Sequence, residues 1–152
     1  MLALYVKQWL CMNLNNVKFR AWHKEYKRML KVINLEWLGD EFESLFKVCT
    51  WHDGDSIFGT HYDPREVELM QWTGLQEKNE VDIYEGDILC YDQGGGVDTF
   101  IIERNPDDHQ LQARYLYMSG YNTDYLAEAP YEDSVIVGNC FENPELLEET
   151  NG

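Results

Sequence analysis

Basic residues are scarce in this sequence of 152 residues: 12 Lys and Arg stand against 28 Asp and Glu, and the formal net charge is −16. A surface with this balance repels phosphates, so the composition excludes a protein that binds nucleic acid over its whole surface. Hydrophobic residues make up 44% of the chain, enough for a packed core and too many for wholesale disorder. The length corresponds to one domain, or to one domain with a small appended subdomain.

Cysteine motifs are also lacking. Four cysteines stand at positions 11, 49, 90 and 140, and none forms a CxxC pair or lies at zinc-finger spacing from a histidine. Because no clear secretory signal is present, we expect reduced thiols in a cytoplasmic protein rather than disulfides. The second and third cysteines lie in apolar runs and are expected to pack as small core residues.

No hydrophobic run is long enough to cross a membrane. The apolar segment 1–12 is interrupted by Lys7 and is far shorter than the ~20 residues that a spanning helix needs. Since Met12 is a plausible second start, we expect residues 1–11 to be an upstream extension that is disordered or makes an accessory contact. We predict no contact with a membrane.

The charge is distributed unevenly along the chain. The first 31 residues carry +6 and the remaining residues carry −22. A basic segment of this kind can bind nucleic acid, or it can pair with the acidic body in cis or in a neighbouring subunit. We favour pairing, because charge runs are usually solvated or self-paired.

Alternation of apolar and polar residues with a period of two dominates the sequence and predicts strands. The expected strands are 17–22, 29–37, 45–51, 67–72, 83–91, 97–103, 111–118 and 134–137. Polar residues 23–27 would turn the chain between the first two strands, although the lysines and the arginine there would also align on a helix face. Residues 144–149 are the best helical candidate, since Asn143 can cap and Pro144 suits the first helical position. Short strands separated by turns favour a barrel or roll.

Three blocks of the sequence resemble the YopX-like family of phage and prophage proteins. They are the opening block Lys18–His23 with Lys27–Leu30, the central block Leu69–Leu75 with Ile83–Ile88, and the closing block Val135–Asn139 with Phe141–Leu147. The blocks occur in order and cover the chain from about Val17 to Glu149. The resemblance implies a mainly β fold with some α+β character, an SH3-type barrel or roll of antiparallel strands, and an oligomeric protein with no established activity.

This resemblance also divides the chain. Residues 1–16 are expected to be an N-terminal extension, residues 17–65 a β-hairpin subdomain, and residues 66–152 an SH3-type barrel with a short terminal helix. The family brings no catalytic residues and no cofactor with it. The resemblance therefore points to a non-enzymatic protein.

One departure from the family pattern concerns a turn. The family reads Lys-Asn-Gly-Lys where this chain has Lys78-Asn79-Glu80, so a two-residue Asn-Gly hairpin is excluded and we expect Asn79 in the left-handed region. Gly86 fits a sharp bend or bulge, with the flanking acids exposed or bonded to nearby backbone N–H groups. The glycines at 74 and 138 are interpreted in the same way.

Metal and nucleophile chemistry have weak signals. His52, Asp53, Asp55, His61 and Asp63 fall within twelve residues, but their spacing and the nearby glycines indicate a polar loop rather than a metal site. The triple glycine at 94–96 lacks the Lys and Ser or Thr of a phosphate-binding loop. We predict no metal and no catalytic residues.

Two groups of residues are candidates for contacts with other molecules. The opening hairpin could grip a nucleic acid or a partner through Lys18, Arg20, Trp22, Lys24, Lys27 and Arg28. Candidate interface positions are Tyr115, Tyr117, Tyr121 and Tyr125, because tyrosine is favoured at interfaces.

The leading hypothesis is a self-associating accessory protein of the host-cell cytoplasm, with a homo-oligomer or an unknown host or phage protein as partner. The alternatives are nucleic-acid binding through the basic hairpin and an acidic mimic of DNA that inhibits a host protein.

Overall fold

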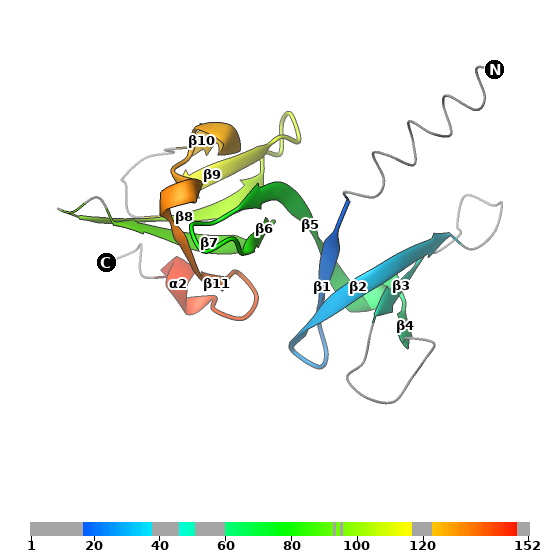
Figure 1. The fold of residues 1–152 in the computed structure, drawn as a ribbon. Coiled ribbons are helices and arrows are strands. Elements are labelled where there is room, and N and C mark those ends of the chain that lie inside the picture. Colours follow the sequence, from blue (N-terminus) through cyan, green and yellow to red (C-terminus); the bar gives the residue numbers. More distant parts are fainter. Residues whose placement is uncertain are drawn as a thin grey trace, which may run out of the picture.

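The structure, a computed structural model, describes residues 17–37, 46–50, 60–92, 94, 96–116 and 123–148 (Figure 1). The first sheet contains β1 (Phe19–His23), β2 (Arg28–Trp37), β3 (Phe46–Thr50), β4 (Thr60–Tyr62), β5 (Val67–Gln76) and β6 (Asp82–Tyr84). The second contains β7 (Asp87–Asp92), β8 (Val97–Arg104), β9 (Leu111–Tyr115), β10 (Thr123–Tyr125) and β11 (Val135–Asn139). The helical elements are η1 (Pro64–Glu66), η2 (Leu126–Glu128), η3 (Tyr131–Asp133) and α2 (Glu145–Glu148).

The first sheet has the order β4-β3-β2-β1-β5-β6, which places β1 between β2 and β5. β1 and β2 form the predicted opening hairpin, in which His23 pairs with Arg28. The Lys27 N–H closes its turn by donating to the His23 carbonyl at 2.9 Å, and Lys27 has a φ of 50°. A buried cluster on one face of this sheet consists of Ala21, Leu30, Tyr62 and Val67.

The second sheet has the order β10-β9-β8-β7-β11, and all its ladders are antiparallel. Leu89, Phe100, Ile102 and Ala113 of its central strands build the larger core together with Ile83 of β6, and each of these residues is fully buried. The chain is therefore mainly β, as expected. In the described strands the two sheets stay open and do not close into one barrel.

β5 lies between β1 and β6 in the first sheet. Its first half pairs with β1, and its second half pairs with β6 at Trp72 and Gln76. Between these two positions the register shifts, and Gly74 takes a φ of 87°. The strand is longer than the predicted 67–72, because this bulge allows it to continue past the glycine where we expected it to end. The boundary at residues 65 and 66 stays a prediction.

The predicted strand 83–91 is two strands, which is a correction. The turn at Glu85 and Gly86 separates β6 from β7, and Gly86 has a φ of 82°. The Gly86 N–H donates to the Ile102 carbonyl at 2.7 Å, and the Gly86 carbonyl accepts from the Cys140 N–H at 2.9 Å. A Cβ at this position would lie 2.9 Å from the Cys140 Sγ. The interpretation of this glycine as a sharp bend is confirmed.

The turn that departs from the family pattern differs from our expectation. Glu80, and not Asn79, takes the left-handed conformation, with a φ of 65°. The Glu77 side chain stabilises the turn by accepting from the N–H groups of Asn79 and Val81. Glu80 therefore occupies a glycine-type conformation at the position where the family has glycine.

Gly138 lies beside a register shift between Ile136 and Gly138, which confirms the expected irregularity. A Cβ at Gly138 would lie 2.5 Å from the Asn143 Oδ1. That oxygen accepts from the Asn139 N–H, so the Asn143 side chain closes this loop. The Asn143 carbonyl accepts from the Leu146 N–H at 3.1 Å, and the capping of α2 by the Asn143 side chain stays a prediction. Packing of the Asn143 side chain therefore explains the glycine.

Other predicted elements correspond closely to observed ones, and two short strands, β4 and β10, were not predicted. The predicted extension 1–16 lies outside the described residues. Within the described part of the chain, no helix is long and apolar enough to cross a bilayer.

Candidate functional site

The basic side chains of β1 point toward β6, β7 and the acids that flank them. Arg20 donates through its Nη2 to the Asp87 Oδ1, and its guanidinium lies over the Tyr84 ring, 4.8 Å from the centroid. The Asp87 side chain is 1% exposed and also accepts from the Tyr84 N–H at 2.8 Å. Asp87 therefore joins the first strand to the turn at Gly86.

A second unit of the same kind lies two residues earlier, at Lys18 directly before β1. The Lys18 Nζ lies 2.6 Å from the Asp82 Oδ2 and 4.2 Å from the centroid of the Trp72 ring. This pair is more exposed, at 48% for the Lys18 side chain and 25% for Asp82. Both units place a cation between an aromatic ring and a carboxylate, an arrangement that holds a cation by charge and by the ring quadrupole.

Burial and pairing shift the pKa values of these groups in opposite directions. Burial raises the pKa of the Asp87 carboxyl, and the Arg20 guanidinium acts against this rise. The hydrogen bond from Lys18 lowers the pKa of Asp82, and the same bond raises the pKa of Lys18. Asp82 is thus ionised at neutral pH and holds Lys18 charged.

Trp22 of β1 is buried against the loop that follows β11. It is 7% exposed, and its ring stacks on Phe141 with centroids 5.9 Å apart. Since a base can stack only on an accessible ring face, this contact occupies the aromatic residue that we proposed for nucleic-acid contact.

The remaining candidates of the hairpin divide into paired and unpaired cations. Lys24 forms an ion pair with Glu68 at 2.7 Å. Arg28 donates to the Tyr62 hydroxyl at 3.3 Å, and its Nε is buried without a hydrogen-bond partner. Lys27 is exposed and forms no ion pair within the described ranges. Hence three of the five candidate cations are neutralised in the chain itself.

The tyrosines that we proposed as interface positions lie in different environments. Tyr115 is partly buried and packs against Phe100, with ring centroids 5.4 Å apart. Burial raises the pKa of Tyr115 to about 12, together with the Asp124 carboxylate, which accepts a hydrogen bond from the Tyr115 hydroxyl. Tyr125 is 56% exposed on β10. Tyr117 and Tyr121 lie outside the described residues.

The acidic cluster of the loop is only partly described. His52, Asp53 and Asp55 lie outside the described residues. Asp63 caps η1 and pairs with Arg65 at 2.8 Å, and hydrogen bonds from Arg65 lower the pKa of Asp63 to about 2. In the part of the chain that the structure describes, no three His, Cys, Asp or Glu side chains are placed to hold a metal ion.

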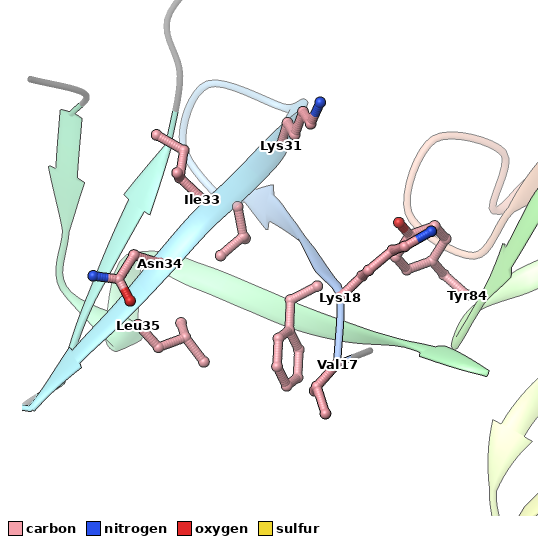
Figure 2. A pocket seen from close by; sticks show the side chains of 9 residues that line it. Val17, Lys18, Lys31, Ile33, Asn34, Leu35 and Tyr84 are labelled. Carbon is pink, nitrogen blue, oxygen red and sulfur yellow. The ribbon is translucent and has the colours of Figure 1, made fainter. Parts of the chain in front are cut away.

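A groove of about 570 Å³ opens between the start of β1 and the second half of β2 (Figure 2). It exists because the β1–β2 register ends at the pair Arg20 and Lys31, whereas β2 continues to Trp37. Figure 2 shows Val17 and Leu35 on either side of this gap. Lys18, one of the candidate residues, borders this groove.

The sequence did not identify the partners of the basic hairpin. Asp82, Tyr84 and Asp87 lie more than 60 residues from the β1 cations with which they interact. In the sequence, these three residues are marked only by their position around the glycine bend of the central block. That position indicated a turn and not an ion pair.

The fold and the site define a mainly β protein of two open sheets, in which Arg20 of the first sheet pairs with Asp87 of the second. The family model described as YopX protein matches residues 18–148. The chain therefore belongs to the YopX protein family. No curated protein gives a match to the sequence.

Two solved structures are similar to the chain. Protein EF1440 from Enterococcus faecalis is 26% identical, with a TM-score of 0.56 over 86% of this chain and 97% of that one. Protein yopX from Bacillus subtilis is 18% identical, with a TM-score of 0.52 over 86% of this chain and 95% of that one, and this likeness concerns the fold. The family that the sequence motifs indicated is confirmed.

Proposed function

We propose that this YopX-family chain is a non-enzymatic accessory protein of phage or prophage origin that associates with itself in the host-cell cytoplasm. The observation that carries the proposal is the combination of open sheets with an apolar groove and exposed apolar side chains on a strongly acidic chain. Unpaired strand edges and exposed apolar residues favour association. We also propose that β5 to β11 correspond to the SH3-type unit of the family.

The contacts of the basic hairpin support self-association over nucleic-acid binding. Lys18, Arg20 and Lys24 already face carboxylates, and a phosphate would have to displace them. These pairs leave the net charge of the chain at −16, so the surface as a whole still repels phosphates. Such a surface binds a second copy of the chain through apolar contacts and through the few cations that form no ion pair within the described residues.

Light scattering coupled to size exclusion at tens of micromolar tests the proposal. We expect a molar mass that is a multiple of 17.9 kDa. A mass of a single chain throughout the peak would defeat it. The gene neighbourhood tests the origin, since genes for other phage proteins are expected on both sides.

The net charge of −16 favours one second candidate, an acidic mimic of DNA that occupies a host DNA-binding protein. Purification from host lysate would then recover a basic DNA-binding partner, displaced by added DNA. Recovery of this chain alone removes the support for this alternative.

A further inference from the structure

The groove at the start of β1 has an apolar lining that nothing in the described chain covers. Its walls include Val17, Phe19, Val32, Ile33 and Leu35, and two of these are widely exposed, Val17 at 44% and Ile33 at 45%. Exposed apolar residues gathered in a recess, unlike single ones scattered over a surface, mark a binding site.

The rim of the groove carries a free cation. Lys31 lines the groove, is exposed, and forms no ion pair with any residue that the structure describes, whereas Lys18 on the same rim is held by Asp82. In a chain that carries −22 beyond its first 31 residues, an uncompensated lysine beside an apolar recess is unusual. The occupant that fits is an apolar side chain flanked by carboxylates.

The second sheet offers such a surface at its edge. β10 is the edge strand, so one side of it has no neighbouring strand in the described sheet (Figure 1). Tyr125 on this strand is 56% exposed, and Glu128, three residues later in η2, is also exposed. A protruding tyrosine beside a carboxylate complements an apolar groove with a lysine on its rim.

We propose that the β10 edge of one copy, with Tyr125 and Glu128, docks into the β1–β2 groove of a second copy, where Glu128 faces Lys31. This inference rests on the proposed self-association and identifies the surfaces that carry it. The two surfaces belong to different sheets of the chain, so the contact is heterologous, and repeating it generates a ring or a filament.

Two double variants test the contact without disturbing the core. Val17→Asp with Lys31→Glu alters only exposed groove residues, and Tyr125→Ser with Glu128→Lys alters only exposed residues of the edge. Each variant alone is expected to associate at least about tenfold more weakly than the wild type. The edge variant loses the tyrosine anchor and its carboxylate, and the groove variant loses the apolar wall and the lysine that receive them. The control for the first is Lys27→Glu at the hairpin tip, and the control for the second is Glu148→Lys on α2; both should associate like the wild type.

Mixing gives the decisive result. The groove variant keeps its β10 edge and the edge variant keeps its groove, so a mixture of the two should form a 1:1 heterodimer that cannot grow further. If the mixture stays monomeric although the wild type associates, or if neither variant weakens association, the inference is overturned while the proposed self-association stands. If another segment of the same chain fills the groove, the groove variant should have a lower free energy of unfolding and unchanged association. That result also overturns the inference. A monomeric wild type would defeat the proposed function itself.

Discussion

Removal of the Asp87 carboxylate should destabilise the protein far more than removal of any exposed acid. In Asp87→Ala, the Arg20 guanidinium, with its side chain 18% exposed, loses its carboxylate, and the Tyr84 N–H loses its acceptor. Breaking a buried ion pair by removing one partner costs about 3–5 kcal/mol. Since the Tyr84 ring still faces the guanidinium, we expect a loss near the lower limit, about 3 kcal/mol in the free energy of unfolding.

Urea unfolding followed by tryptophan fluorescence measures this loss, provided that the slope of the free energy against urea is unchanged. The matched control is Asp82→Ala, which removes the carboxylate of the exposed unit, with Lys18 48% exposed. Solvent screens that pair, so the loss should be much smaller.

A double variant separates the ion pair from the packing around it. Arg20→Met leaves the Asp87 carboxylate buried and should also cost about 3 kcal/mol, but Arg20→Met with Asp87→Leu removes both charges and should cost much less than the sum. Additive losses, or an Asp87→Ala loss equal to that of Asp82→Ala, would refute the reasoning.

Three further predictions concern single groups. Glu80→Gly should raise the free energy of unfolding by about 0.5–1 kcal/mol in thermal or urea unfolding, because relief of left-handed strain exceeds the entropy cost of glycine; a loss of stability would contradict this. The pKa of Asp63 is about 2 in the folded chain, below its ordinary 3.8. Its pairing with Arg65 therefore stabilises the fold above pH 3.8, and this stabilisation is lost as the pH falls toward 2. In melting temperatures measured over a series of pH values, Asp63→Asn should lack this loss of stability in acid. The pKa of Tyr115 is raised to about 12, so its contribution to the stability of the fold is complete below pH 10 and is lost as the pH rises through 12. NMR of the tyrosine ring should follow this titration. Asp124→Asn should lower the pKa of Tyr115, and an unchanged pKa would exclude the contact between the hydroxyl and the carboxylate.

Local sequence patterns identified most strands because the signal for a strand lies within the strand itself. β8 and β11 were found from short runs of apolar residues, and the turn at Gly86 from the rarity of other residues in such a bend. β4 and β10 have three residues each, too few for a period of two to be visible. The split of β6 from β7 was missed because the bend at Gly86 was interpreted as a bulge within one strand rather than as the end of β6.

The site was harder to predict because its partners are distant in sequence. The basic residues of β1 were recognised as a group, and pairing in cis was the favoured interpretation. However, periodicity shows which face a side chain occupies and not which strand lies opposite. The pairing of β1 with β5, which brings Arg20 toward Asp87, depends on contacts across more than 40 residues. The left-handed Glu80 was missed because propensity favoured Asn79.

The most direct test asks whether the basic hairpin binds nucleic acid at all, since three of its five candidate cations already face carboxylates of the chain itself. Fluorescence anisotropy of a labelled single-stranded oligonucleotide at low salt compares the wild type with the variant Lys24→Ala, Lys27→Ala, Arg28→Ala. The account predicts no saturable binding that the three substitutions change. Saturable binding by the wild type that this variant loses would contradict it.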